Sequence, residues 1–277
     1  KDMLIQTYCS PIDGKKLDVL GISEGRGGDI LKFYFAKVNF MLSTDVSSDV
    51  IESTTDGWLS RYRKFKSNKK YTNFPKMVSI QADATVKFDY ESQKKKLLNM
   101  TPNNEKLLKK YFNENKQKFD RVNCQFALHY FLRNEESWNN FTDNINQFLK
   151  EDGYAIFTCF DGDVVNSLLK GKNKYEVNYT DKKGVKRTFF SIDKKYNDTD
   201  NIGLGFPIEV FISSFMNEGE TEYLVSKNFL IKELSEKCNL ELVDTNLFSD
   251  LYEVNRNYFK NTIYYEDNER TRDFLIK

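Results

Sequence analysis

A glycine-rich turn between an apolar run and an amphipathic segment limits what this chain can fold into more than any other feature. The apolar run 17–22 leads into Ser23-Glu24-Gly25-Arg26-Gly27-Gly28-Asp29, and apolar residues then recur from Ile30 to Val38 with a spacing nearer to helix than to strand. Strand, glycine turn and helix in this order open a nucleotide-binding α/β unit, because glycine lets the backbone approach a ligand closely. A plain loop at a helix start has a similar composition, so the turn alone leaves both interpretations open.

The alternation of strand and helix continues along the first part of the chain. Short apolar runs predict strands, and longer segments with helical spacing of apolar residues lie between them. The predicted strands after 17–22 are 39–44, 77–82, 119–124 and 154–160, and the helices between them are 48–66, 94–118 and 135–149. Five alternations favour an α/β fold with a mostly parallel sheet and helices on both faces.

Polar residues follow the predicted strands at the edge where such sheets bind ligands, beyond their carboxyl ends. Asp45 ends the second strand, 20 residues after Gly25, a spacing that suits a carboxylate accepting from both ribose hydroxyls. Asp83 ends the third strand, and residues 122–131, with the chain's one histidine, His129, follow the fourth. We expect these residues to meet around a ligand. The simpler alternatives are a solvated strand-end Asp and a buried structural histidine.

The pattern changes after Gly162. Segments 174–180 and 187–192 predict an antiparallel hairpin, and further strands are expected at 207–215 and 220–225. A helix over 227–238 and a late core strand over 239–244 complete the prediction. We expect one domain, with a core of about 15–162 and 226–277 and a β-rich insert of about 163–225 that covers the ligand edge as a lid.

Composition excludes several classes of protein. No run approaches the roughly 18 apolar residues of a membrane helix, and net charge is +1, so nucleic-acid contact requires a local basic patch. The four cysteines form no C-x-x-C pair, which disfavours structural zinc and suggests a reducing compartment. The chain begins at Lys1 and stops in mid-pattern, so we expect it to be part of a longer protein.

The turn also discriminates between cofactors. It matches neither the phosphate loop of nucleotide hydrolases nor the G-x-G-x-x-G dinucleotide fingerprint, and Asp29 places an acid beside it. A carboxylate there repels a pyrophosphate but suits the cationic S-adenosylmethionine, whose ribose fits Asp45 and whose adenine amine fits Asp83. Electrostatics therefore favours this cofactor over NAD.

Several of these residues together resemble a known family. The motifs appear in the order Gly25-Arg26-Gly27-Gly28-Asp29-Ile30-Leu31-Lys32, Asp45, Arg61-Tyr62, Ala82-Asp83, Cys124-Gln125-Phe126-Ala127-Leu128-His129-Tyr130, Asp161-Gly162-Asp163 and Thr221-Glu222-Tyr223-Leu224. This order resembles the mRNA cap guanine-N7 methyltransferases, most of all the methyltransferase domains of capping enzymes from poxviruses and African swine fever virus. The resemblance implies a Rossmann-like class I S-adenosylmethionine-dependent methyltransferase with a seven-stranded sheet.

The resemblance also implies roles for individual residues. The positions expected at the cofactor are Lys1, Ser23, Gly25, Asp29, Asp45, Asp83, Gln125 and Tyr130. Those expected around the cap are Arg26, Lys32 and Arg61 at its phosphates, and Phe126, His129, Tyr130 and Glu222 at its guanine. Guanine N7 carries a free lone pair, so no general base is expected; His129, Tyr130 and Glu222 would position the base, and proximity and electrostatics would supply the catalysis.

The glycine turn departs from the family pattern. Gly21 and Ser23 stand where the family has an acid and its first glycine, and Glu24 and Arg26 replace a cysteine and a lysine. Ser23 bears on how the cofactor's methionine part binds, though not on where it binds. The family's late tyrosine has no match before Lys277, so the cap pocket of this chain is expected to be incomplete.

The resemblance also implies binding partners and a location in the cell. It implies a guanylyltransferase and triphosphatase region in the same polypeptide, the capped 5′ end of mRNA as substrate, an activating subunit as a further possibility, and no membrane partner. A viral protein of this kind would act in the host cytoplasm or the virion. The alternatives are a methyltransferase for another RNA site or a small molecule, and a non-catalytic domain that stimulates a partner.

Overall fold

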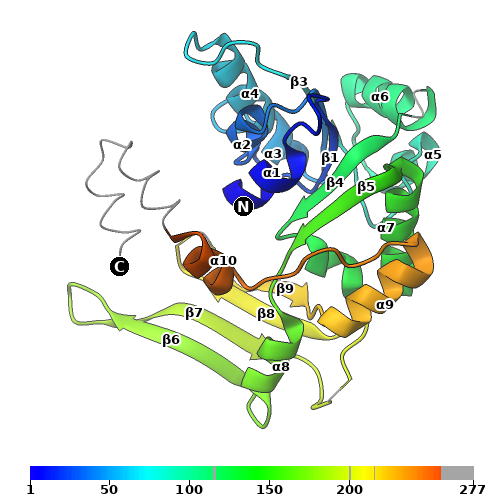
Figure 1. Ribbon diagram of the computed structural model, residues 1–277. Helices are drawn as coiled ribbons and strands as arrows, with labels where there is room; N and C mark the ends of the chain where they lie inside the picture. The colour runs from blue at the N-terminus through cyan, green and yellow to red at the C-terminus, as the bar shows by residue number, and fades with distance from the viewer. Residues whose placement is uncertain (115–116, 200, 215, 257–277) are drawn as a thin grey trace. The chain divides into compact units, whose positions relative to one another are not determined.

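A parallel five-stranded sheet forms the centre of this computed structural model, which describes residues 1–114, 117–199, 201–214 and 216–256 (Figure 1). The strand order is β3-β2-β1-β4-β5, and every pairing is parallel. The strands are β1 (Asp18–Ile22), β2 (Phe40–Asp45), β3 (Lys76–Gln81), β4 (Phe119–Gln125) and β5 (Leu149–Thr158). β1, β2 and β4 are almost wholly buried, as expected of parallel strands covered on both faces.

Helices connect these strands in the predicted order, but two of the long predicted helices are divided. Segment 48–66 breaks at the turn-forming run Ser53-Thr54-Thr55-Asp56-Gly57, and segment 94–118 breaks before Pro102, where the Thr101 side chain caps a new helix. The helices of this region are α1 (Asp2–Cys9), α2 (Ile30–Phe35), α3 (Ser48–Glu52), α4 (Trp58–Ser67), α5 (Tyr90–Lys96), α6 (Pro102–Leu108), a π-helical segment (Lys109–Glu114), a 3₁₀ helix (Leu128–Arg133) and α7 (Glu135–Phe148).

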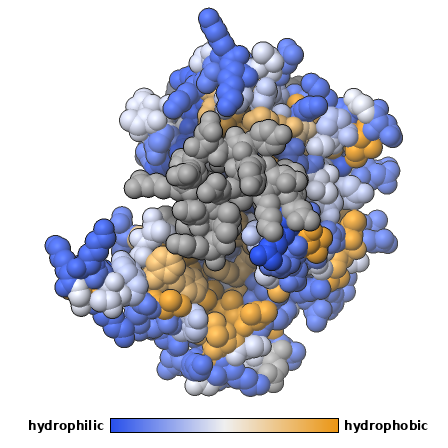
Figure 2. All heavy atoms as spheres, turned by 60° about the vertical axis from the view of Figure 1, so that its left-hand side comes forward, coloured by the Kyte–Doolittle hydropathy of each residue, from blue (hydrophilic) through white to orange (hydrophobic). Residues whose placement is uncertain are grey.

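A second, antiparallel sheet follows β5, in the region where the lid was expected. Its order is β6-β7-β8-β9, and the α8 helix precedes it while the α9 helix follows it (Figure 1). The bounds are α8 (Gly162–Leu169), β6 (Lys174–Thr180), β7 (Lys186–Lys194), β8 (Pro207–Ile212), β9 (Glu220–Tyr223) and α9 (Lys227–Cys238). Figure 2 shows hydrophobic side chains gathered in the lower part of the molecule, at the level where Figure 1 draws this sheet.

The described residues contain five strands in the parallel sheet rather than the expected seven. The predicted late strand at 239–244 is wrong: no strand forms there, and Leu242 and Val243 are 51% and 66% exposed. Alternating apolar residues suit a strand, but a strand also needs a neighbour to accept its backbone hydrogen bonds. Contacts divide the chain into a unit from Lys1 to Asn239 and a second from Leu240 on, whose described part holds one helix, α10 (Phe248–Val254).

The glycine turn is fixed by packing beneath it. Gly27 has a φ of 74°, and a Cβ there would lie 2.6 Å from Ile30 Cδ1 and 2.8 Å from Trp58 Cδ1, so only glycine fits. Trp58 and Phe33 are fully buried in the same apolar cluster. The backbone of the turn therefore rests directly on the core.

Among the described residues, no helix combines the length and apolar character required to cross a membrane. The described His, Cys, Asp and Glu side chains likewise form no cluster suited to a metal ion.

Candidate active site

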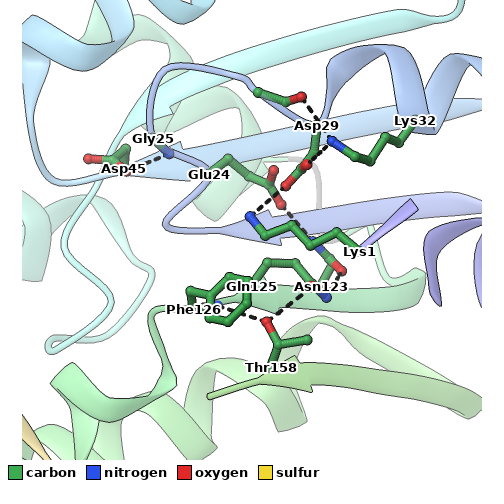
Figure 3. Close-up of polar contacts among 11 residues, drawn as sticks. Lys1, Glu24, Gly25, Asp29, Lys32, Asp45, Asn123, Gln125, Phe126 and Thr158 are labelled. Atoms are coloured by element: carbon green, nitrogen blue, oxygen red, sulfur yellow. Dashed lines mark hydrogen bonds and ion pairs between the residues drawn. The ribbon is translucent and has the colours of Figure 1, made fainter. Parts of the chain in front are cut away.

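Asp45 joins the end of β2 to the glycine turn that follows β1. Its Oδ2 accepts the Gly25 N–H at 2.8 Å (Figure 3). Its Oδ1 accepts the Ser47 N–H at 3.0 Å. Burial raises the pKa of Asp45 above its usual value, although these backbone hydrogen bonds oppose the shift. Each carboxylate oxygen keeps a further lone pair, so Asp45 can still accept from a ligand's hydroxyl groups. Gly25 and Asp45, which the sequence placed at the same edge of the sheet, are thus joined directly.

Asp29 is held between two lysines. Its Oδ2 lies 3.0 Å from Lys1 Nζ, and its Oδ1 lies 2.6 Å from Lys32 Nζ (Figure 3). Burial alone would raise the pKa of Asp29, but the hydrogen bonds and charges of the two lysines outweigh it and lower the pKa. Lys1 Nζ also lies 5.1 Å from the centre of the Phe126 ring. Asp29 therefore anchors Lys1 and also pairs with Lys32, the residue expected at the cap phosphates.

Glu24 is a site residue for which sequence reasoning predicted no role. Its Oε1 accepts from Asn123 Nδ2 at 2.8 Å, and burial raises its pKa to about 8 (Figure 3). A Cβ at Gly21 would lie 2.5 Å from both Cγ and Oε1 of Glu24. The Glu24 carboxyl thus occupies the space beside Gly21, which is where the family carries its acid. The sequence held one indication of this role: Gly21 stands where the resemblance places an acid, and an acid, Glu24, stands three residues later.

The segment after β4 is held against β5. Gln125 Nε2 donates to Asn123 Oδ1 at 2.8 Å, and Gln125 Oε1 accepts from Thr158 Oγ1 at 3.1 Å. The Phe126 N–H donates to the Thr158 carbonyl at 2.9 Å. Phe126 has a φ of 59° and is 45% exposed, an uncommon backbone conformation for an aromatic residue. Strained conformations of this kind cluster at functional sites, where the surrounding contacts enforce them.

The 3₁₀ helix places His129 and Tyr130 against β9 of the antiparallel sheet. His129 Nδ1 lies 3.7 Å from Glu222 Oε2, and Tyr130 Oη donates to Glu220 Oε2 at 3.3 Å. Both His129 and Glu222 are buried. Within the described part of the chain, neither ring nitrogen of His129 has a hydrogen-bond partner.

Burial disfavours the charged forms of both His129 and Glu222. It lowers the pKa of His129 to about 4, and burial followed by the nearby Glu220 raises the pKa of Glu222 to about 7. Burial and the two glutamates also raise the pKa of Tyr130. At neutral pH, His129 is a neutral imidazole beside a carboxyl group that is near its midpoint of ionisation.

The remaining predicted residues have local partners of their own. Asp83 Oδ1 accepts from the N–H and hydroxyl of Thr85, and Asp83 Oδ2 lies 3.6 Å from Lys96 Nζ. Arg26 pairs with Asp49 at 2.6 Å and Asp56 at 2.7 Å. Arg61 Nε donates to the carbonyl of the same Asp56 at 3.0 Å. Asp56 thus brings Arg26 and Arg61 together at the start of α4.

Two groups of residues emerge at the carboxyl edge of the parallel sheet. We name the first the cofactor region, defined by Gly25, Asp29, Asp45 and Gln125. We name the second the base region, defined by His129, Tyr130 and Glu222. Ser23 has a φ of 56° beside the first group, a conformation that glycine adopts more readily.

Comparison with known proteins defines the class first. The chain resembles the CcbJ methyltransferase from Streptomyces caelestis with a TM-score of 0.51 at 10% identity, over 88% of this chain and 78% of that one. Together with the strand order, this likeness confirms the expected Rossmann-like class I S-adenosylmethionine-dependent methyltransferase fold.

The family follows from sequence comparison. Residues 1–269 match the model of the mRNA (guanine-N(7))-methyltransferase domain, and the chain belongs to this family. It is 45% identical over 264 residues to a probable mRNA-capping enzyme of Acanthamoeba polyphaga mimivirus, covering 95% of this chain and 22% of the relative.

More distant relatives come from a poxvirus and a plant. The chain is 25% identical over 280 residues to the mRNA-capping enzyme catalytic subunit of fowlpox virus, covering 99% of this chain and 29% of that protein. It is 25% identical over 248 residues to the mRNA cap guanine-N(7) methyltransferase 1 of Arabidopsis thaliana, covering 88% and 57%. The chain thus spans less than a third of the two viral relatives.

Proposed function

We propose that this chain transfers a methyl group from S-adenosylmethionine to N7 of the terminal guanine of capped mRNA. The structural observation that carries the proposal is the buried pair of His129 and Glu222. His129 follows Gln125 of the cofactor region closely in the chain, and Glu222 reaches it from β9. In the described structure, neither ring nitrogen of His129 has a hydrogen-bond partner, which leaves both available to a ligand. Family membership supplies the identity of the reaction.

The residues of the cofactor region fit a cationic nucleoside. Asp45 has lone pairs free for ribose hydroxyls, and Asp29 supplies a carboxylate to the same region. Beside the region, Glu24 has a pKa that burial raises to about 8, and a bound ammonium or sulfonium charge would favour its ionised form. When bound, S-adenosylmethionine supplies an electrophilic methyl group. Lys1, Ser23, Asp83, Gln125 and Tyr130 complete the proposed cofactor contacts.

The base region fits guanine. A carboxylate at Glu222 can accept from both N1–H and N2–H of the base, and these donors compensate a charge that burial otherwise disfavours. The exposed faces of Phe126 and Tyr130 offer stacking worth about 1–3 kcal/mol per base. His129 is neutral at physiological pH, so it orients the base through a hydrogen bond and does not act as a proton shuttle.

The chemistry requires no base to remove a proton. Guanine N7 would attack the methyl group through its lone pair, and the bond from that methyl group to sulfur would break, which releases S-adenosylhomocysteine. Positive charge would move onto the purine. The chain's residues hold N7 in line with the methyl group, and such positioning can contribute several kcal/mol. The Glu222 carboxylate, hydrogen-bonded to the same purine, stabilises the charge that develops there.

Arg26, Lys32 and Arg61 are the proposed contacts of the cap phosphates. In the described structure, Arg26 is already paired with Asp49 and Asp56, so a phosphate would have to replace these carboxylates. Both carboxylates are exposed, and exposed ion pairs stabilise proteins by at most about 1 kcal/mol, which makes the exchange energetically small.

The relatives suggest the wider setting. Because the chain spans 22% of the mimivirus capping enzyme and 29% of the fowlpox subunit, we include in the proposal a guanylyltransferase and triphosphatase region in the same polypeptide. An activating subunit and a place in the host cytoplasm or the virion belong to the same proposal.

The test uses cofactor labelled in its methyl group and RNA that begins with either GpppA or m7GpppA. We expect label to enter only the unmethylated cap and to be released as 7-methylguanine. Label in both RNAs would indicate another RNA site, and label in neither, with the cofactor bound, would indicate a non-catalytic domain.

A further inference from the structure

One stretch of the chain concentrates positive charge. Residues 57–82 contain seven Lys and Arg and no Asp or Glu, whereas the whole chain has a net charge of +1. The remainder of the chain therefore carries a net negative charge. This distribution differs from the evenly mixed charges of an ordinary solvated surface.

Six of these seven side chains lie on α4 and the loop that follows it, and Lys76 begins β3. Apart from Arg61, which is a proposed contact of the cap phosphates, we name those of α4 and its loop the α4 basic surface, which consists of Arg63, Lys64, Lys66, Lys69 and Lys70. All five are exposed, and none belongs to an ion pair among the residues that the structure describes. Their charges are thus available to a polyanion.

Aromatic rings lie among these cations. Tyr71, in the loop after α4, packs edge-on against Tyr34 and Phe35 of α2, with ring centres 5.3 and 6.3 Å apart, and Lys70 Nζ lies 5.9 Å from the Tyr71 ring. Phe35 is 54% exposed, although it is a large apolar side chain. Figure 1 draws α2 beside α4, and Figure 2 shows mainly hydrophilic side chains with a few hydrophobic ones among them in the upper part of the molecule.

We propose that the α4 basic surface, together with Phe35, binds the single-stranded RNA that follows the cap. Cations that track a backbone, combined with aromatic faces on which bases stack, are the features by which proteins hold single strands without reading their sequence. The identity of the polyanion as RNA rests on the proposed function.

The surface is continuous with the proposed cap site. Arg61, a proposed contact of the cap phosphates, lies three residues before Lys64 on α4, and this spacing places the two side chains on the same side of the helix. A helix rises about 1.5 Å per residue, so the rest of α4 extends by roughly 9 Å before the loop with Lys69 and Lys70 continues the chain. RNA leaving the cap site along this side of α4 would meet Lys64 and then the cations of the loop.

The test compares two variants with equal loss of charge. One replaces Arg63, Lys64, Lys69 and Lys70 by Gln; the control replaces four exposed lysines of the antiparallel-sheet region, Lys172, Lys182, Lys183 and Lys186, by Gln. Binding of an uncapped, unstructured 15-nucleotide RNA is measured by fluorescence anisotropy over a salt series. Methyl transfer to the dinucleotide GpppA is measured in parallel.

We expect the α4 variant to bind the RNA at least about tenfold more weakly at low salt, with a salt slope shallower by about 0.7 for each phosphate that it no longer neutralises. The control should bind within about twofold of the parent chain, and both variants should methylate GpppA normally. A Phe35→Leu variant, which keeps the apolar contact but removes the ring, should weaken binding several-fold.

The failure of this proposal is distinct from the failure of the proposed function. Equal weakening in the two charge variants would overturn the α4 surface even if GpppA is methylated. Binding of vesicles with anionic lipid, without binding of RNA at the same salt, would overturn it in favour of a membrane surface. Absence of methyl transfer, with selective loss of RNA binding in the α4 variant, would support the surface and reject the reaction.

Discussion

The cofactor region and the base region lie next to each other, yet their polar groups are satisfied to different extents. In the cofactor region the carboxylates and amides have protein partners: Asp29 pairs with two lysines, and Asp45 accepts two backbone N–H groups. In the base region His129 has no hydrogen-bond partner among the described residues, and Glu222 lies 3.7 Å from it without a cation.

This difference suggests how binding energy is divided between the two ligands. A region whose polar groups are already satisfied is preorganised, so a ligand meets fixed acceptors and loses little free energy in ordering them. A region with buried unpaired groups is destabilised by them until a complementary base supplies partners, which gives it selectivity for that base. Substitutions in and beside the two regions separate these contributions.

Replacing Asp45 by Ala should have the largest effect. The change removes an acceptor from two backbone N–H groups and from the proposed ribose contact. Each hydrogen bond to a charged group contributes about 1.5–3 kcal/mol, so cofactor affinity should fall at least about a hundredfold by calorimetry without RNA. An Asp49→Ala variant, which removes an exposed carboxylate nearby, should bind the cofactor normally. Unchanged affinity in Asp45→Ala would remove this residue from the site.

Replacing Glu222 by Gln should reduce cap methylation and change its pH dependence. Because the pKa of Glu222 is raised to about 7, its carboxylate form increases as pH rises through 7, and kcat/KM for GpppA should increase over the same range. The Gln variant should lose roughly tenfold or more in kcat/KM and should lack this rise. A pH profile identical to that of the parent chain would show that another group titrates.

The raised pKa of Glu222 also affects stability: as pH rises, cap methylation should increase, whereas the free energy of unfolding should decrease. A carboxyl group whose folded pKa lies above its unfolded value stabilises the fold while it is protonated. That contribution is lost as pH rises from about 4.5 through 7. Glu222→Gln should therefore unfold at a higher temperature than the parent at pH 8, with a smaller difference at pH 5, as thermal melts at the two pH values would show.

Replacing Gly21 by Ala should cost about 1–2 kcal/mol of stability, because the new Cβ meets Glu24 and displaces it from Asn123. Gly28→Ala is a matched control, since a Cβ there meets nothing within 4 Å. Adding Glu24→Ala to Gly21→Ala should cause little further loss in denaturant titrations. If the loss of unfolding free energy in the double variant equalled the sum of the losses in Gly21→Ala and Glu24→Ala, the proposed contact between position 21 and Glu24 would be contradicted.

Replacing Ser23 by Gly should have the smallest effect and the opposite direction. Ser23 has a φ of 56°, which costs a non-glycine residue about 1–2 kcal/mol, partly offset by the greater chain entropy of glycine. We expect a gain of about 0.5 kcal/mol, or roughly 1–2 °C in Tm. Ser47→Gly, at a φ of −89°, should not stabilise. A lower Tm for Ser23→Gly would mean that the serine side chain contributes a contact.

Much of the architecture was predictable because it depends on local patterns. Apolar runs followed by acids located β2 and β3, and the run before the glycine turn located β1. The sequence also placed Gly25 and Asp45 at the same edge of the sheet, where the structure joins them by a hydrogen bond. The sequence wrongly predicted a strand at 239–244, because alternating apolar and polar residues do not show whether a neighbouring strand is present to pair with. The predicted seven strands came from the family resemblance, and the described part of the chain has five.

Within the site, the missing information was tertiary. The sequence showed Gly21 and Glu24 as separate departures, and only the packing shows that the side chain of one fills the space left by the other. Similarly, the sequence did not show that Lys32, expected at the cap phosphates, also pairs with Asp29, three residues earlier on the same turn. Such partners depend on how β1, β4 and the turn converge.

The contrast between the two regions is tested most directly by His129→Ala, with cofactor affinity and cap methylation measured on the same preparation. His129 is buried in the base region and has no described hydrogen bond to the cofactor region. We predict that the cofactor Kd changes by less than about twofold while methylation of GpppA falls by more than about tenfold, the loss expected from one buried hydrogen bond. An increase in the cofactor Kd as large as the loss of activity would contradict the division.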